Sequence, residues 1–241
     1  MDGNGRWAQA RGLDRTEGHA EGARAVRDAV ETAARIGIEY LTLYAFSNAN
    51  WQRPRAEVEA LMRLLVDFAR RERAELRAQG IRTVVIGQLE ELPTATRQAV
   101  EDLMAYTADG QQMTLSLALS YGGRQDIVEA ARALAVRARA GLVLPEEIDV
   151  DFFHREMSTS RLPDVDLLIR TGGETRVSDF LLFEAAYAEL CFLDLMWPDF
   201  RPATLVECVE RYGAKERRFG RTSAQVQSAS GRAFDPIDQG L

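Results

Sequence analysis

The chain has 241 residues, 46% of them hydrophobic and 28% charged, which is ordinary for a globular protein with one large or two small domains. The net charge of −7 argues against a nucleic-acid-binding protein, because such domains usually carry a basic excess. No apolar run approaches the roughly 20 residues that a membrane span needs. Cys191 and Cys208 make no disulfide framework, so we expect a cytoplasmic protein with reduced thiols.

Apolar runs typical of strands alternate along the chain with longer patterns typical of helices. Helices are expected at residues 18–36, 57–78, 94–107, from 124 to about 140, and 204–218. Strands are expected at residues 40–46, 81–86, 113–119, 166–170 and 190–195. This alternation predicts an α/β fold, with right-handed crossovers and a mainly parallel central sheet flanked by helices. We expect a single domain at residues 1–222, followed by a flexible tail at 223–241.

The loop after the strand at 166–170 combines a pair of glycines with arginine and serine side chains. Ligands of open parallel sheets bind beyond the carboxyl ends of the strands. Glycines let the backbone approach a ligand there, and the arginine fork matches phosphate oxygens. Arg170, Arg176 and Ser178 are therefore predicted to form a phosphate or diphosphate clamp.

The N-terminal segment MDGNGRW has the composition of a second anion-binding loop. Its glycines expose backbone N–H groups, while Arg6 and Arg15 add positive charge and His19 lies near a predicted helix start. Asp2 is the one acid of this loop, and a carboxylate beside phosphates is a natural magnesium ligand. The alternative is an ordinary N-terminus with a tight turn.

Polar loops also follow the strands at 40–46 and 113–119. In the first, Ser47 and Asn50 can hydrogen-bond a substrate and Trp51 offers an apolar wall, although a helix-start turn with a packed indole explains the same residues. The second, SYGGRQD, is either a further ligand-binding loop or a Gly-Gly turn followed by Asp126 at a helix start. Glu189 further on is either a ligand or a surface carboxylate.

Together these loops resemble one family. The motifs DGNGRW, LYAFS with NWQRP, YGGR, IRTGGETRVS, AYAEL and WPDF occur in the order seen in the cis-prenyltransferases, and most resemble the bacterial undecaprenyl diphosphate synthases. The resemblance runs from residue 1 to about residue 220. The chain lacks the DDxxD motif of trans-prenyl enzymes, a phosphate-binding GxxxxGK[ST] loop and a nucleophile elbow.

The resemblance implies an enzyme that joins isopentenyl diphosphate to an allylic diphosphate, usually farnesyl diphosphate, with a new cis double bond in each round. The residues that would hold the allylic diphosphate are Gly3, Asn4, Gly5, Arg6, Arg15 and His19. Those that would hold isopentenyl diphosphate are Arg170, Arg176 and Ser178. Asp2 would act with Mg²⁺ to promote departure of the allylic diphosphate, and Glu189 would help to bind that metal.

The resemblance also assigns residues around the reacting carbons. The region would be lined by Ser47, Asn50, Trp51 and Arg53, with Asn50 a candidate in the proton-removal step. The same loops add further substrate-binding residues, namely Trp7, Asn48, Ala49 and Val177. Relatives are homodimers, so we expect a homodimer, with peripheral membrane contact for release of the lipid product. The basic run at 215–221 is either a solvated helix end or part of the dimer interface.

A growing prenyl chain needs an apolar tunnel. One wall is expected from Leu61, Leu64, Leu65 and Phe68, and the floor from Leu115, Leu117 and Leu119, although core packing explains each of them equally well. Ala45 is small where a bulky residue would block elongation. We therefore expect a product near undecaprenyl diphosphate in length, serving as a carrier lipid for cell-wall glycans. The alternatives are a short-chain cis-prenyl diphosphate synthase and a non-catalytic subunit, which would lose Asp2 and the loop after it.

The chain departs from the family pattern at a few positions. Relatives have an apolar strand leading into the first motif, whereas this sequence starts at the motif, so a leading strand is expected to be missing before Met1. Either the start codon is misassigned, or this version of the protein lacks that strand. Ala49 stands where relatives usually carry Glu, and Ser120 where many carry Asn. These changes affect local hydrogen bonds and not the expected reaction.

Overall fold

A computed structural model describes residues 1–215 of the chain, and its strands are all parallel. β1 (Tyr40–Ser47), β3 (Met113–Tyr121) and β2 (Ile81–Gly87) form one sheet in the order β1-β3-β2. β4 (Leu167–Arg170) and β5 (Glu189–Phe192) form a second, two-stranded sheet. The predicted α/β fold is confirmed, and the strands are divided between two sheets.

β3 lies at the centre of the larger sheet and is buried at every position. Its sequence MTLSLALSY alternates leucines with small, mostly polar residues, and Thr114, Ser116 and Ser120 are buried along with the leucines. The register aligns Leu117 of β3 with Leu43 of β1 and with Val85 of β2. The main core is built around this strand from apolar side chains of the sheet and its helices.

The helices predicted from the sequence are present with shifted ends. They are α2 (Arg15–Arg35), α3 (Arg55–Ala78), α4 (Thr94–Tyr106), α5 (Gly123–Arg139) and α7 (Pro202–Gly213). Two shorter helices were not predicted, α1 (Asn4–Gln9) and α6 (Val150–His154), because neither is long enough to show a helical period. Helix α7 ends at Gly213, five residues before the predicted end at 218.

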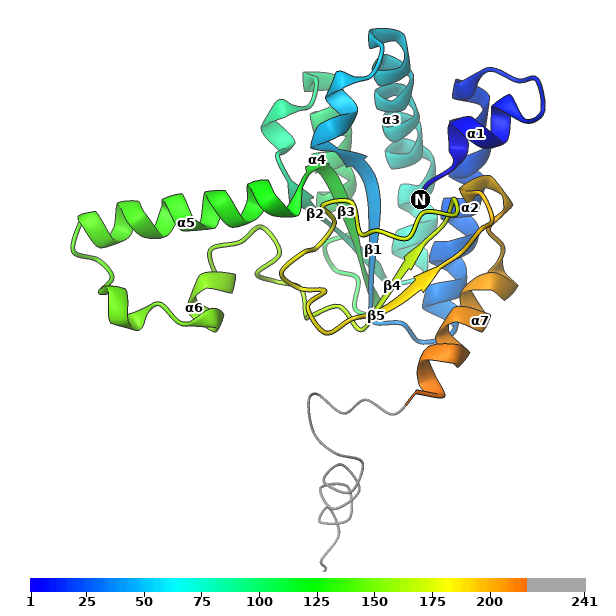
Figure 1. Cartoon of the computed structure of the whole chain (residues 1–241). Helices are drawn as coiled ribbons and strands as arrows, with labels where there is room; N and C mark the ends of the chain where they lie inside the picture. The colour runs from blue at the N-terminus through cyan, green and yellow to red at the C-terminus, as the bar shows by residue number, and fades with distance from the viewer. Residues whose placement is uncertain (216–241) are drawn as a thin grey trace, which may run out of the picture.

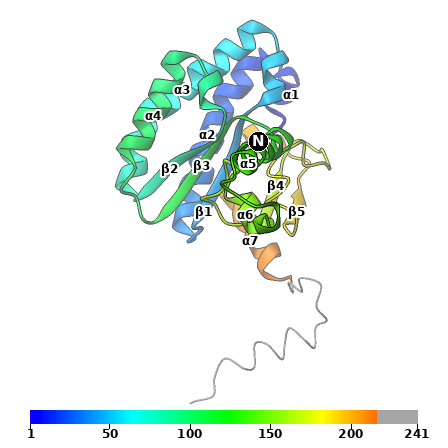
Figure 2. The ribbon, with the colours of Figure 1, turned by 90° about the vertical axis from the view of Figure 1, so that its left-hand side faces the viewer.

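Most of the helices lie along the sheets, whereas α5 extends away from them. Figure 2 shows α3 and α4 side by side along the three-stranded sheet. Figure 1 shows α5 projecting away from the sheets, with α6 turned back below it. The predicted tail at 223–241 lies outside the described residues, as does the basic run beyond Lys215. Among residues 1–215, no helix is long and apolar enough to cross a membrane.

The start of the chain is packed tightly against α2. Asp14 caps this helix, accepting a hydrogen bond from the Thr16 N–H at 2.9 Å. Gly18 then faces α1 so closely that a Cβ on it would lie 2.0 Å from the carbonyl oxygen of Asn4. Gly22 one turn later accepts a hydrogen bond from Trp197 Nε1 through its carbonyl at 2.9 Å. The small residues of α2 therefore fix the N-terminal loop beside the carboxyl ends of the strands.

Candidate active site

A cavity of about 230 Å³ opens beside the N-terminal loop and extends between β1, β3 and the helices α2 and α3. Its lining divides into a polar part and an apolar part. The polar part comprises Asp2, Gly3, Asn4, Gly5, Arg6, Arg15, His19, Asn50 and Arg53. All six residues predicted to hold the allylic diphosphate are therefore brought together at one place.

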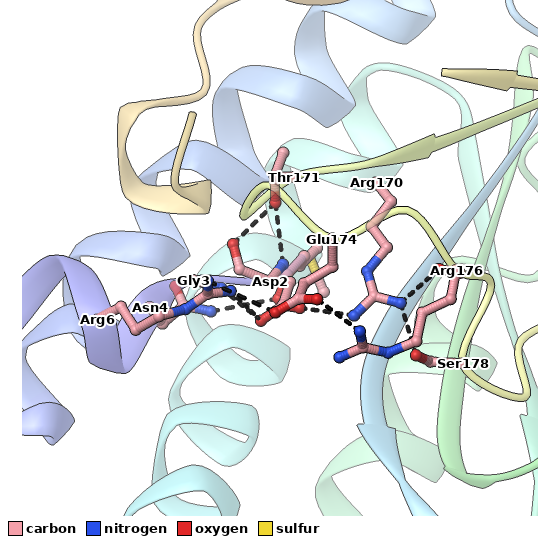
Figure 3. A network of polar contacts seen from close by, with 10 residues as sticks. Asp2, Gly3, Asn4, Arg6, Arg170, Thr171, Glu174, Arg176 and Ser178 are labelled. Atoms are coloured by element: carbon pink, nitrogen blue, oxygen red, sulfur yellow. Dashed lines mark hydrogen bonds and ion pairs between the residues drawn. The ribbon is translucent and has the colours of Figure 1, made fainter. Parts of the chain in front are cut away.

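The N-terminal loop is held to the end of β4 by main-chain hydrogen bonds of Asp2. The Thr171 hydroxyl accepts from the Asp2 N–H at 2.9 Å and donates to the Asp2 carbonyl at 2.8 Å (Figure 3). The same carbonyl also accepts from the Trp197 N–H at 2.9 Å. Gly3 has a φ of 101°, and a Cβ on it would lie 2.5 Å from Met196 Sδ, so both its conformation and its space require glycine.

The Asp2 side chain meets the arginine clamp directly. Arg170 Nη2 donates to Asp2 Oδ2 at 2.8 Å, and Arg6 Nη2 lies 3.5 Å from Asp2 Oδ1 (Figure 3). Burial acts to raise the pKa of Asp2, but the hydrogen bond from Arg170 and the positive charges outweigh it, so the pKa is lowered overall. Asp2 is therefore an ionised carboxylate at neutral pH, and its side chain is 40% exposed.

The clamp itself is organised by Arg170. Its Nη1 donates to Ser178 Oγ at 2.5 Å and also to the main-chain carbonyl of Arg176 (Figure 3). The Arg176 guanidinium donates instead to Glu174 Oε2 at 2.5 Å and is largely exposed. Ser178 has a φ of 48°, a left-handed conformation that non-glycine residues rarely adopt. The predicted clamp residues are neighbours, with Arg170 as the link between Asp2 and Ser178.

Two arginines and a histidine surround a buried acid that the sequence did not single out. Glu57, in the first turn of α3, lies 3.0 Å from Arg53 Nη1, 3.4 Å from Arg15 Nε and 3.4 Å from His19 Nε2. Burial lowers the pKa of His19, the nearby Arg53 lowers it further, and Glu57 opposes both. The spacing of Arg53 and Glu57, four residues apart at a helix start, was the only signal available in the sequence.

The loop after β1 continues into a short 3₁₀ helix, η1 (Asn48–Gln52), and places its side chains in different directions. Asn50 lines the cavity, and its Oδ1 accepts a hydrogen bond from the Ser47 N–H at 3.0 Å. Trp51 Nε1 turns to the Ser120 hydroxyl at 2.7 Å, and that hydroxyl lies 3.2 Å from Asn48 Oδ1. Trp51 and Asn48 therefore hold the loop against Ser120 and do not line the cavity.

Like the three clamp residues, four more predicted site residues are not part of the cavity lining. Trp7 Nε1 donates to Asp199 Oδ1 at 2.9 Å, and Ala49 is exposed. Val177 is half-buried, with its carbonyl accepting from the Phe180 N–H at 3.3 Å. Glu189 begins β5 opposite Leu167, at the end of the small sheet away from Arg170, and pairs with Lys215. The structure of this chain does not bring Glu189 to Asp2.

The apolar part of the cavity matches most of the predicted tunnel. It is lined by Leu61, Leu64, Leu65 and Phe68 of α3, by Leu117 and Leu119 of β3, and by Ala45 of β1. Leu115 is not part of this lining and is fully buried in the main core, because it lies further from the carboxyl end of β3. A charged mouth and an apolar interior define a class of enzyme that handles a long apolar molecule carrying a phosphate group.

Comparisons with known proteins place the chain within that class. The family model described as "Putative undecaprenyl diphosphate synthase" matches residues 1–220. An isoprenyl transferase of Porphyromonas gingivalis is 48% identical over 226 residues, which are 94% of this chain and 89% of that protein. The ditrans,polycis-undecaprenyl-diphosphate synthase ((2E,6E)-farnesyl-diphosphate specific) of Xanthomonas axonopodis pv. citri is 45% identical over 226 residues, 94% of this chain and 88% of that protein.

A solved structure agrees with these relatives. Lavandulyl diphosphate synthase from Lavandula x intermedia, in complex with dimethylallyl diphosphate, has a TM-score of 0.89 and 36% sequence identity. The match covers 92% of this chain and 95% of that chain. The chain belongs to the undecaprenyl diphosphate synthase family of prenyltransferases.

Proposed function

We propose that this enzyme condenses isopentenyl diphosphate onto an allylic diphosphate, with farnesyl diphosphate as the starter, and builds a cis-polyprenyl diphosphate. The observation that carries the proposal is the cavity, in which arginines and one ionised carboxylate surround the mouth and leucines line the interior. Such a cavity matches both halves of a prenyl diphosphate, because the head carries negative charge and the tail is apolar.

The two diphosphates occupy adjacent positions on either side of Asp2. The allylic diphosphate is held by the N-terminal loop and by Arg15, His19 and Arg53, which line the cavity. Isopentenyl diphosphate is held by the clamp at Arg170. Because Arg170 contacts the Asp2 carboxylate, the two reacting groups are held close together, which makes their coupling effectively unimolecular.

Mg²⁺ fits this site through Asp2. The carboxylate is ionised and faces the cavity, and Mg²⁺ is commonly bound by one or two carboxylates together with substrate phosphates. Among residues 1–215, no group of three or more His, Cys, Asp or Glu side chains is placed to hold a metal, so substrate oxygens would complete the shell. When bound, the ion supplies positive charge that stabilises the departing diphosphate. We also propose that Glu189 helps to bind the metal, although its carboxylate pairs with Lys215 in this structure.

Asn50 orients a substrate and does not itself remove the proton. Its Oδ1 already accepts the Ser47 N–H, so its amide N–H groups are the ones left for a substrate oxygen. An amide is a poor base, and the released diphosphate is the proton acceptor that remains in the cavity. Asn50 would therefore hold isopentenyl diphosphate so that the proton leaves toward a diphosphate oxygen.

We propose a medium-chain product, near undecaprenyl diphosphate in length, that serves as a carrier lipid for cell-wall glycans. The apolar lining of the cavity and the small Ala45 on β1 support elongation beyond the starter. The structural likeness to lavandulyl diphosphate synthase favours a short-chain product as the second candidate. We further propose a homodimer in the cytoplasm that contacts a membrane peripherally to release product, in keeping with two unbridged cysteines.

The test is incorporation of labelled isopentenyl diphosphate onto farnesyl diphosphate by the full chain, with Mg²⁺ or with EDTA, beside an Asp2→Ala variant. The proposal expects Mg²⁺-dependent product from the unmodified chain and a loss of at least 100-fold in the variant. Chromatographic sizing of the product then separates the medium-chain from the short-chain candidate. Absence of any prenyl product from the unmodified chain would reject the proposed reaction.

A further inference from the structure

Glu57 is a buried carboxylate behind the part of the cavity that Arg15, His19 and Arg53 line. It is 9% exposed, and its two carboxylate oxygens face two arginines and the His19 imidazole at 3.0 to 3.4 Å. Arg15 and His19 come from α2, whereas Arg53 precedes α3, so one carboxylate joins two separate segments. Burial acts to raise the pKa of Glu57, but Arg53 and Arg15 outweigh it and lower the pKa, so the group is ionised.

The position of Glu57 distinguishes it from its partners. Arg15, His19 and Arg53 line the cavity, and Glu57 does not. These three side chains therefore stand between the carboxylate and the space where a diphosphate would bind. Without the acid, Arg15 and Arg53 would repel each other in a partly buried site, and their long side chains would have to be ordered by the substrate.

The hydrogen bonds made by Glu57 leave the arginines able to bind a ligand. Arg15 uses only Nε toward Glu57, and Arg53 uses Nη1. A guanidinium has five N–H donors, so each arginine keeps several that can reach phosphate oxygens. The Arg15 guanidinium is also fixed from the other side, because it packs beside the Cα of Gly5.

We propose that Glu57 is a positioning residue that assembles Arg15, His19 and Arg53 into a preformed cradle for the allylic diphosphate. This inference rests on the proposed function, which places the allylic diphosphate in this part of the cavity. A preformed cradle lowers the ordering cost of binding and affects one substrate only, because isopentenyl diphosphate is held by the separate clamp at Arg170.

A purely structural role is the competing explanation. Glu57 lies in the first turn of α3, where an acid favours the helix, and it links α3 to α2. Glu72 offers a matched control, because it is also 9% exposed, lies on α3 and pairs with Arg27 of α2. Glu72 does not line the cavity, so its loss reports on the helix pairing alone.

The experiment compares E57Q and E72Q in the full chain. We expect E57Q to raise the KM for farnesyl diphosphate at least tenfold while the KM for isopentenyl diphosphate changes less than twofold, and E57D to recover part of the loss. E72Q should leave both KM values within twofold. Thermal unfolding of both variants measures any loss of stability that the two substitutions have in common.

Titration calorimetry with inorganic diphosphate tests the cradle independently of turnover. A tenfold or greater loss of affinity in E57Q, with E72Q unchanged, supports the inference. Equal affinities and KM values in the two variants would overturn it, as would an equal rise in both KM values of E57Q. If the unmodified chain binds diphosphate but transfers no prenyl group, the proposed function is rejected. The calorimetry on E57Q and E72Q then decides by itself whether Glu57 assembles the cradle.

Discussion

Replacing Gly5 with alanine should separate substrate binding from stability. Gly5 lies in α1, and a Cβ on it would lie 2.6 Å from Cζ of Arg15 and 2.8 Å from each of its Nη atoms. Ordinary contacts between such atoms are about 3.5 Å, so the guanidinium must retreat by about 1 Å. A hydrogen bond of normal length does not survive a displacement of that size.

The expected magnitude follows from the bond that is lost. A hydrogen bond to a charged group contributes about 1.5–3 kcal/mol, and each 1.4 kcal/mol is about tenfold in affinity. The KM for the allylic diphosphate should therefore rise about 10- to 100-fold in G5A. Stability should be unchanged or slightly higher, because the displaced group is a flexible side chain and alanine favours a helix over glycine by up to about 1 kcal/mol.

The assay is steady-state kinetics for each substrate, combined with thermal unfolding. Gly213→Ala is the matched control, since a Cβ at this last residue of α7 would meet nothing within 4 Å. G213A should keep both KM values. A G5A variant with an unchanged KM for the allylic diphosphate, or one whose main defect is a loss of stability, would refute the role given to Arg15.

Three further substitutions test other parts of the structure. Burial raises the pKa of Glu184, so the stability that this group contributes is complete below its unfolded-state pKa and is lost as pH rises through its folded-state pKa. E184Q keeps a hydrogen-bond acceptor for Thr159 and does not titrate. Its thermal stability should therefore rise relative to that of the unmodified chain as pH increases from 4 to 8. S120A removes the acceptor of Trp51 Nε1 and should lower the urea-unfolding free energy by about 1–3 kcal/mol. A45F narrows the apolar part of the cavity and should shorten the product on chromatography.

Each of these expectations has a definite contrary result. A stability difference between E184Q and the unmodified chain that stays constant with pH would show that Glu184 keeps its ordinary pKa in the fold. An S120A variant as stable as the parent would show that Trp51 finds another acceptor. Unchanged product length in A45F would place the growing chain elsewhere.

Helices and strands with a strong hydrophobic period were predictable from the sequence, whereas contacts between distant loops were not. Leu115, Leu117 and Leu119 recur at every second position, so β3 was recognisable as a strand, but its burial on both faces was not. The hydrogen bonds between Thr171 and Asp2 join residues with no local pattern in common. Glu57 was not singled out from the sequence, because a sequence does not reveal that α2 covers this acid.

The link between Asp2 and Thr171 spans 169 positions of sequence, which bears on how the site forms during synthesis. Thr171, Arg170 and Trp197 are synthesised long after Asp2, with which each of them forms a hydrogen bond. Contacts of such long range form late, because a large loop must close before they contribute any stability. A nascent chain therefore carries its reactive carboxylate without the groups that orient it, and becomes competent only when the segment from Arg170 to Trp197 is in place.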